Sequence, residues 1–436
     1  MESVRILALV EHVDRELDVL ALVKYQLGLR HGIDLRVANF YTDAPLLLNA
    51  PAPHIVLLPF CYGSNETTIR DYFNAWPDTR FYNLAWEQIL SSSGRTLKAP
   101  RDEKARTQVV HLAWSAEFVE HLAASGVPRD RIVLVGHWLL GLYGSKYRSY
   151  FQPREELARR FGLDSRKRWI FVPENYRWAF LSDERLQSMA KPGLSREALF
   201  DMRAFCHHTL TQLLTWCQRL ATDEQVEVIL RPRPATSLRE FRRFVETQTS
   251  IAVPAFRLIK DLTVREWVLA SDVTVSTYST VLIEAALAAK QVVMVAPTPI
   301  PQSLRYEWCD FVEPVVSEQE FMDRSMSHGN DSSAPLREWA TGQFFPETDP
   351  IETLTRVIAA FAREPFIAQP RTEPATMEMP RWMKLLTARL TPRMRHRVFA
   401  AGLPGYAFNA STHEKDVFGA AEVERRCEAW RRALPP

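Results

Sequence analysis

Short apolar runs alternate with longer amphipathic stretches from the first residues of the chain onward. The runs have the length of buried strands, and the amphipathic stretches repeat their apolar positions at helical spacing. In the first half this pattern predicts strands at 4–10, 34–40, 54–60, 81–84, 109–113 and 131–135, with helices near 15–30 and 116–124. Strands that alternate with helices indicate a parallel sheet covered on both faces. The first half therefore predicts one doubly wound domain.

The alternation begins again after an irregular, charged stretch at 144–167. It predicts strands at 168–172, 225–230, 256–259, 272–276 and 291–295, with helices near 199–220, 237–247, 263–270 and 279–289. We therefore expect an α/β protein with two tandem doubly wound, Rossmann-like domains. Their predicted bounds are 1–145 and 168–365, separated by a linker at 146–167 and followed by a basic helical tail at 366–436. Ligands of such folds bind at the carboxyl ends of the strands, so we expect the chemistry in the loops there.

The composition narrows the function classes. The chain has 436 residues, 46% of them hydrophobic, and a formal net charge of +2, which argues against a protein built mainly to coat nucleic acid. Its five cysteines include no C-x-x-C pair, so neither a disulfide framework nor a zinc cluster is indicated. Prolines at 45, 51, 53 and 59 interrupt the longest uncharged stretch, which excludes a membrane span there. We expect a cytoplasmic protein that needs no metal or other cofactor.

The clearest candidate site lies between the predicted strand 272–276 and the helix that follows it. Hydroxyl side chains gather there at Ser276, Thr277, Ser279 and Thr280, next to backbone amides that begin a helix and favour an anion. Glu284 lies one turn further on, where its carboxylate would accept hydrogen bonds from a ribose diol. Ser279 as an ordinary helix cap is the simpler alternative. The cluster of hydroxyls together with the carboxylate favours a ligand site.

Arg231 and Arg233 end the predicted strand 225–230 in the sequence Arg-Pro-Arg-Pro. Guanidinium groups bind phosphate or carboxylate in a bidentate manner, so these two residues are predicted to anchor an anionic donor. A solvated basic loop is the alternative.

Glu174, Asn175 and Arg177 follow the predicted strand 168–172, where we expect them at the seam between the domains. If burial raises the pKa of Glu174, its carboxylate would serve as a base or nucleophile. Glu174 would equally cap a loop or pair with Arg177, and both interpretations stay open.

Glu11 and His12 end the first predicted strand, and Glu87 follows the strand at 81–84. A histidine beside a glutamate at a strand end can move protons. An ordinary hydrogen-bonded histidine is the alternative, and Glu87 is a candidate of the same kind.

Two other features of the sequence give weaker evidence of a function. Cys206, His207 and His208 are adjacent on a predicted helix, where their side chains diverge, so we interpret them as packing residues and not as metal ligands. The stretch 379–413 contains no acidic residue and interleaves basic with apolar side chains. It suits docking on an anionic membrane surface, or a helix packed on the body with its basic side in solvent.

The order of short motifs resembles bacterial surface carbohydrate biosynthesis proteins, which are similar to the capsule and O-antigen Kdo transferases of GT-B fold. The resemblance spans roughly residues 1–365 and rests on Val-Glu-His at 10–12, Asn-Leu-Ala-Trp-Glu-Gln at 83–88, the run 130–136, Pro-Glu-Asn-Tyr at 173–176, Arg-Pro-Arg-Pro at 231–234, and Ser-Thr-Tyr-Ser-Thr at 276–280 before Glu284.

This resemblance implies transfer of a sugar, such as Kdo from CMP-Kdo, to a glycan or lipid-linked acceptor at the inner face of the cytoplasmic membrane. It also implies that Ser279, Thr280 and Glu284 hold the nucleotide, while Arg231 and Arg233 face its phosphate or the sugar carboxylate. Relatives commonly have Arg-Pro-His-Pro, and Arg233 stands at the histidine position. A sugar-nucleotide epimerase, a CDP-polyol phosphotransferase or a non-catalytic partner in glycan assembly are the alternatives, because a fold does not fix the chemistry.

Overall fold

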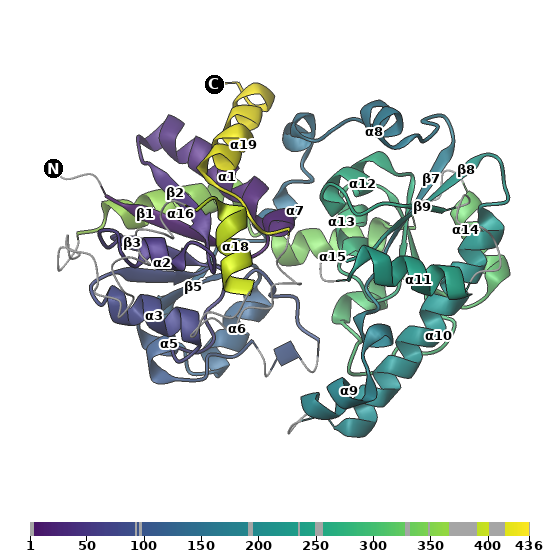
Figure 1. Cartoon of the computed structure of the whole chain (residues 1–436), viewed down its shortest axis with the longest axis horizontal. Helices are drawn as coiled ribbons and strands as arrows, with labels where there is room; N and C mark the ends of the chain where they lie inside the picture. The colour runs from purple at the N-terminus through teal and green to yellow at the C-terminus, as the bar shows by residue number, and fades with distance from the viewer. Residues whose placement is uncertain are drawn as a thin grey trace. The chain divides into compact units, whose positions relative to one another are not determined.

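The computed structural model describes residues 4–91, 94–95, 98–190, 195–233, 236–248, 256–327, 332–347, 349–365, 390–400 and 415–435. The chain divides into two units, which we call the first and the second domain (Figure 1). The first domain comprises Met1–Gln88, Leu97–Leu142 and Gln343–Pro436, and the second comprises Ile89–Thr96 and Tyr143–Gly342.

The first domain is built on a parallel sheet of six strands in the order β2-β1-β3-β4-β5-β6. Ile6 of β1 lies opposite Leu35 of β2 and Ile55 of β3, which sets the register of the central strands. The strands are β1 Ile6–Val10, β2 Leu35–Asn39, β3 Ile55–Leu58, β4 Arg80–Asn83, β5 Val109–Ala113 and β6 Ile132–Leu134. All residues of β1 and β3 are buried, as expected for strands covered on both faces.

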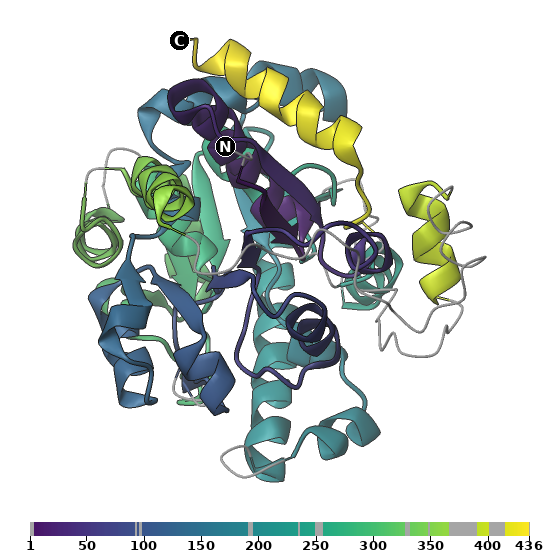
Figure 2. The same ribbon diagram turned by 90° about the vertical axis from the view of Figure 1, so that its left-hand side faces the viewer.

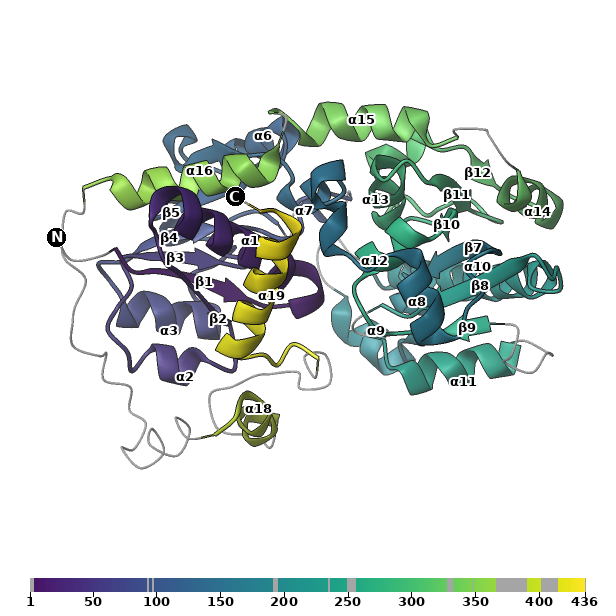
Figure 3. The same ribbon diagram turned by 90° about the horizontal axis from the view of Figure 1, so that it is seen from above.

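The first domain also contains α-helices. They are α1 Val13–His31, α2 Ala44–Leu47, α3 Thr67–Ala75, α5 Glu103–Thr107, α6 Ala116–Ala124, α7 Trp138–Gly141, α16 Pro350–Arg363, α18 Pro392–Ala400 and α19 Ala420–Ala433, with a 3₁₀ turn at Arg129–Arg131. Both α16 and α19 pack against α1 (Figure 3). The C-terminal part of the chain therefore belongs to the first domain, although it follows the second in sequence.

The second domain repeats the plan with a parallel sheet in the order β12-β11-β10-β7-β8-β9. Its strands are β7 Arg168–Pro173, β8 Val226–Arg231, β9 Phe256–Leu258, β10 Val273–Ser276, β11 Gln291–Val295 and β12 Pro314–Val315. Its helices are α8 Arg154–Phe161, α9 Asp183–Met189, α10 Arg196–Leu220, α11 Leu238–Gln248, α12 Val264–Ala270, α13 Val281–Leu287, α14 Glu318–Met326 and α15 Ala334–Phe344, with 3₁₀ turns at Ser145–Tyr150, Arg177–Phe180 and Glu307–Phe311.

Local sequence explains where several helices begin. Ser115, Ser195 and Ser317 each accept a hydrogen bond from a backbone amide in the first turn of α6, α10 and α14. Thr263 and Glu266 form a reciprocal capping box at the start of α12. These caps fix the residues at which the four helices begin.

The structure confirms the predicted fold class of two doubly wound domains. The strands predicted at 109–113 and 291–295 and the helix at 116–124 have the observed bounds. The strand β12 and the helix α16 were not predicted.

The division of the chain differs from the predicted bounds in two places. Residues 146–167, predicted as a linker, lie within the second domain, because Arg154 of α8 donates hydrogen bonds to the Ala270 carbonyl and the Asp272 carboxylate. Residues 343–365 lie in the first domain, where Phe361 of α16 stacks on Tyr82. Of the predicted tail, 390–400 and 415–435 are described and belong to the first domain, and the rest of 379–413 lies outside the described residues.

Candidate functional site

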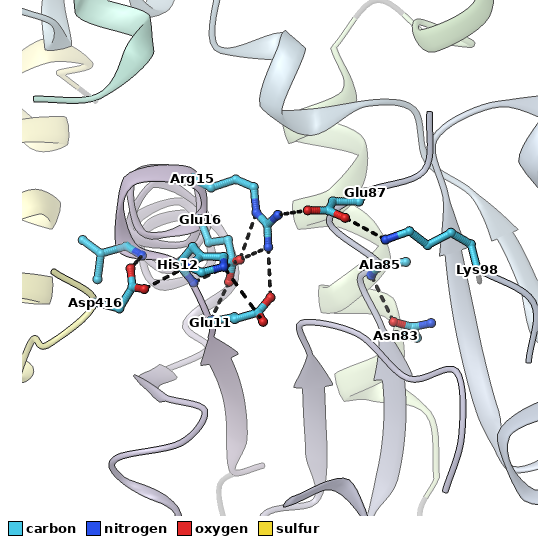
Figure 4. Close-up of polar contacts among 10 residues, drawn as sticks. Glu11, His12, Arg15, Glu16, Asn83, Ala85, Glu87, Lys98 and Asp416 are labelled. Carbon is cyan, nitrogen blue, oxygen red and sulfur yellow. Dashed lines mark hydrogen bonds and ion pairs between the residues drawn. The ribbon is translucent and has the colours of Figure 1, made fainter. Parts of the chain in front are cut away.

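The first domain gathers charged side chains where β1 runs into α1 (Figure 4). Glu16 is fully buried and accepts the backbone amides of Glu11 at 2.7 Å and His12 at 3.2 Å. The guanidinium of Arg15 lies 2.7 Å from Glu16 and 3.1 Å from Glu11. Burial raises the pKa of Glu16 to about 7, although the charge of Arg15 opposes the shift. The start of α1 therefore holds a carboxyl group that can exchange a proton near neutral pH.

His12 is held by a residue from the far end of the chain. Its Nδ1 lies 2.8 Å from Asp416 Oδ2, and its Nε2 lies 4.0 Å from Glu11 Oε1. Burial and the charge of Arg15 both lower the pKa of His12. The hydrogen bond and charge of Asp416, together with the charge of Glu11, outweigh them, so the pKa of His12 is raised. The raised pKa means that His12 keeps its proton to higher pH than an ordinary histidine.

Glu87 is connected to the same cluster through Arg15. It follows β4 in a loop where Ala85 has a φ of 46° and donates its amide to Asn83 Oδ1 at 3.0 Å. The carboxylate of Glu87 lies 2.8 Å from Arg15 and 2.7 Å from Lys98. Desolvation works against ionisation, but Lys98 and Arg15 lower the pKa of Glu87 to about 2. Glu87 is thus a permanent anion near neutral pH and not a proton donor.

In the second domain, Glu174 follows β7 and is 4% exposed. Its two oxygens accept the backbone amides of Tyr176 at 2.5 Å and Arg233 at 3.2 Å, and it also bonds Thr236. Burial raises the pKa of Glu174, and these hydrogen bonds oppose the shift. The side chain of Glu174 therefore connects the loop after β7 to the loop after β8, as the loop-capping interpretation of the sequence expects. A catalytic role of Glu174 stays a prediction.

Two of the predicted donor-binding hydroxyls are enclosed. Ser276 and Thr277 are both fully buried at the end of β10. Ser276 Oγ lies 3.3 Å from the Pro173 carbonyl and 3.4 Å from Asn175 Oδ1, and Thr277 Oγ1 lies 2.6 Å from the Tyr176 hydroxyl. Both side chains hold the loop in place, which leaves Ser279 and Thr280 as the predicted donor contacts.

Ser279 and Thr280 are partly exposed just before α13. Ser279 Oγ accepts the backbone amide of Val281 at 3.4 Å, so this hydroxyl also serves as a cap of the short helix. Thr280 makes no side-chain cap hydrogen bond. Their hydroxyl groups can therefore meet a ligand at the carboxyl end of β10.

Arg231, Arg265 and Glu284 form a charged group beside this loop. Arg231 and Arg265 are each 4% exposed, and Arg231 Nη2 donates to the carbonyl of Leu262 at 2.6 Å. Glu284 is partly exposed and accepts a hydrogen bond from the Tyr143 hydroxyl. Burial raises the pKa of Glu284, while the charges of Arg265 and Arg231 and the Tyr143 bond hold it down. The arrangement presents one carboxylate that is oriented by the Tyr143 hydroxyl and lies in the field of two buried arginines.

The remaining predicted residues lie around the same edge of the second sheet. Arg233 is half-buried, and Arg177 is exposed with its guanidinium over the Trp178 ring. Asn175 is partly exposed, and its backbone carbonyl accepts the Tyr278 hydroxyl at 2.9 Å. Cys206 is buried against the Tyr278 hydroxyl, as expected for a packing residue.

Comparison with known proteins identifies the architecture. No protein family profile and no curated protein sequence matches the chain. Among solved structures, a UDP-N-acetylglucosamine 2-epimerase covers 85% of this chain and 99% of its own at 12% identity and a TM-score of 0.52. The Methanocaldococcus jannaschii UDP-GlcNAc 2-epimerase in complex with UDP-GlcNAc and UDP covers 81% and 99% at 10% identity and a TM-score of 0.51. The wall teichoic acid polymerase TagF covers 83% and 88% at 9% identity and a TM-score of 0.51.

The fold is GT-B. At these identities the likeness establishes the two-domain architecture and does not assign a reaction.

Within the GT-B fold, the predicted residues fall into two groups, one at the carboxyl edge of each sheet. The first domain brings together Glu11, His12 and Glu87, and the second brings together the set Glu174, Asn175, Arg177, Arg231, Arg233, Ser276, Thr277, Ser279, Thr280 and Glu284. Arg15, Glu16, Lys98, Tyr143, Arg265 and Asp416 were missed. Arg15 and Glu16 lie one helical turn after Glu11 and His12, so their spacing could have been noticed; nothing in the local sequence marks Asp416.

No three His, Cys, Asp or Glu residues in the described ranges are grouped so as to hold a metal ion. Among the described helices, none combines the length and the apolar character needed to cross a membrane.

Proposed function

We propose that this chain is an enzyme that acts on a nucleotide-activated sugar and binds the nucleotide with its second domain. The observation that carries the proposal is the group of Arg231, Arg265 and Glu284 beside the partly exposed hydroxyls of Ser279 and Thr280. A carboxylate that is oriented by neighbours suits a ribose diol, and guanidinium charge suits a phosphate. The carboxyl edge of a parallel sheet is where such folds bind nucleotides.

Arg231 and Arg265 would act on the nucleotide through their charge and not through direct contact. Arg231 and Arg265 are almost enclosed, so their charge would stabilise a bound phosphate through the protein interior, where screening by water is weak. Arg233, Ser279 and Thr280 are the partly exposed groups that would contact the nucleotide directly.

Isomerisation of the sugar is the reaction with the better support. The solved structures that share the fold include UDP-GlcNAc 2-epimerases. In the first domain, His12 is the group that we take for the acid–base step, since its side chain is partly exposed and its pKa is raised, while the fully buried Glu16 supports it from behind. Groups that exchange protons near neutral pH can remove a proton from a sugar carbon and return it.

Transfer of the sugar is the second candidate. The order of motifs resembles Kdo transferases, which favours transfer of Kdo from CMP-Kdo to a capsule or O-antigen acceptor, and a teichoic acid polymerase shares the fold. A CDP-polyol phosphotransferase would use the same nucleotide site, and a non-catalytic partner in glycan assembly would use it for binding alone.

Contact with a membrane surface fits the transfer reactions. In α18, Arg393, Met394, Arg397 and Val398 are exposed, while Arg395 faces inward to Asp43 at 2.6 Å. Exposed basic and apolar side chains on one helix suit an anionic bilayer. Residues 379–413 remain our proposed region of peripheral contact with the inner face of the cytoplasmic membrane.

Product analysis separates the reactions. The purified chain is incubated with UDP-GlcNAc, CMP-Kdo and CDP-glycerol, with and without a glycan acceptor, and the products are resolved by anion-exchange chromatography and mass spectrometry. An isomerised sugar still attached to the nucleotide supports epimerisation. Free CMP with a new glycosidic bond supports Kdo transfer, and a new phosphodiester supports polyol phosphate transfer. No turnover and no nucleotide binding across the panel would contradict the proposal.

A further inference from the structure

Residues 415–435 return to the first domain and lie along α1 (Figure 2). Trp430 of α19 is fully buried and donates its indole N–H to the Asp18 carbonyl at 2.9 Å. Arg426 pairs with the Asp18 carboxylate, and the Tyr25 hydroxyl donates to the Leu434 carbonyl at 2.9 Å. These contacts dock α19 independently of the charged cluster at the start of α1.

Asp416 lies just before α19 and is inserted at the end of β1. Its backbone carbonyl accepts Asn39 Nδ2 at 2.8 Å. Its carboxylate spans two groups, with Oδ1 accepting the amide of Val13 at 2.8 Å and Oδ2 at 2.8 Å from His12 Nδ1. The carboxylate is about 9% exposed, so little water competes for these bonds.

Helix capping alone accounts for half of this arrangement. His12 makes no side-chain cap for α1, and Glu16 takes the amides of Glu11 and His12. Asp416 Oδ1 takes the next amide, that of Val13, which is the first residue of α1. A cap needs only that one oxygen, whereas the second oxygen of Asp416 is directed at the imidazole.

We propose that Asp416 is a positioning residue that holds His12 Nδ1 as a hydrogen-bond donor and thereby assigns proton exchange with the substrate to Nε2. The proposal rests on the proposed function, because it takes His12 as an acid–base group of that reaction. A carboxylate on one ring nitrogen fixes the tautomer and the ring orientation, and it stabilises the protonated ring.

The other charged groups that face His12 are Arg15, Glu11 and Glu16. Arg15 disfavours the protonated ring, and Glu11 favours it. Arg15 also pairs with Glu11 and Glu16, so Asp416 makes the direct hydrogen bond that decides the proton position on the ring. A side chain 404 positions away in sequence thus completes the first domain's cluster.

The test reads His12 directly. The full-length protein is labelled with ¹⁵N-histidine, the His12 signals are assigned with His12→Gln, and the ring nitrogens are followed against pH in the wild type and in Asp416→Asn. We expect the variant to titrate at lower pH and to lose the fixed Nδ1–H tautomer. In turnover, we expect kcat to fall by about tenfold or more with an unchanged KM, and the pH profile to shift in the same direction.

Two control variants separate positioning from docking. Arg426→Ala weakens the attachment of α19 at Asp18 and leaves Asp416 intact, and Glu424→Gln changes an exposed carboxylate on α19. Neither should move the His12 titration. An identical titration in the wild type and Asp416→Asn, an equal shift in Arg426→Ala, or a shifted titration with unchanged kcat would each overturn the proposal. The titration needs no substrate, and nucleotide binding by the second domain is measured separately, so failure of the proposed function is recognised independently.

Discussion

The hydroxyl of Tyr143 donates a hydrogen bond to the carboxylate of Glu284, the residue that we propose accepts hydrogen bonds from the ribose of the nucleotide. Tyr143 is the first residue of the second domain's main segment, and Glu284 lies 141 positions later on α13. This hydrogen bond orients the carboxylate of Glu284, which otherwise experiences only the electrostatic attraction of Arg265 and Arg231.

Tyr143→Phe removes this bond and should weaken nucleotide binding by about tenfold to a hundredfold. The loss corresponds to a single hydrogen bond to a charged group, about 1.5–3 kcal/mol at most. Because that bond holds the pKa of Glu284 down, the pKa should rise further in the variant, and the loss of affinity should be larger at pH 6 than at pH 8. Calorimetric titration at the two pH values measures both effects. Tyr25→Phe removes a comparable hydroxyl bond in the first domain and should leave binding unchanged.

Glu174→Gln should destabilise the second domain and lower nucleotide affinity together. Glu174 accepts two backbone amides from the loops after β7 and β8, and glutamine offers only one acceptor oxygen in its place. Leaving a buried amide unpaired costs about 1–3 kcal/mol. Thermal unfolding and calorimetry measure the two effects. Loss of turnover with an unchanged melting temperature and unchanged affinity would instead place Glu174 in the chemical step.

Gly136→Ala should destabilise the first domain strongly. Gly136 has a φ of 92°, and an added Cβ would lie 2.8 Å from the Phe344 carbonyl and 2.9 Å from Pro346. The left-handed backbone alone costs about 1–2 kcal/mol, and the clash with backbone where the chain re-enters this domain adds to it. Gly32→Ala is the matched control, since Gly32 has a φ of 64° and nothing within 4 Å. Urea unfolding should show a clearly larger loss for Gly136→Ala, and equal losses would contradict the crowding argument.

Glu87→Gln should change the acid stability of the first domain. The pKa of Glu87 is lowered from 4.5 to about 2 in the folded protein, so its ionised form stabilises the fold above pH 4.5, by an amount that solvent screening keeps small because the side chain is 62% exposed. That contribution is lost as the pH falls from 4.5 toward 2. The difference in unfolding midpoint between wild type and variant should therefore be constant above pH 4.5 and should shrink below it. A difference that does not change with pH would exclude the ion pairs with Lys98 and Arg15 as its source.

The period of the apolar positions was enough to predict the two sheets, because most strands here are buried and several are followed by long amphipathic helices. The strands at 109–113 and 291–295 were predicted with their exact bounds. The short strand β12 was not predicted, because two residues are too few to show a periodic pattern. The return of α16 to the first domain was not predicted either, because the apolar face of a helix does not indicate which domain it packs against.

The sequence could indicate only part of the candidate site, because it shows where strands end but not which distant segments meet. Residues at strand ends, such as Glu11 and Arg231, can be placed by topology alone. The enclosure of Ser276 and Thr277 depends on partners in the loop after β7, and the pairing of Asp416 with His12 depends on a contact between distant parts of the chain. Neither has a signal in the local sequence.

Calorimetric binding of nucleotides to the full chain tests the central claim most directly. UDP, CDP and CMP are titrated into the wild type, into Glu284→Gln and Arg233→Gln as site variants, and into Arg219→Gln as a control on an exposed arginine of the same domain. We predict saturable binding of at least one nucleotide to the wild type and to the control, with at least about tenfold weaker binding in both site variants. Binding that is unaffected by both site variants, or no binding of any of the three nucleotides, would contradict the assignment of the nucleotide site to the second domain.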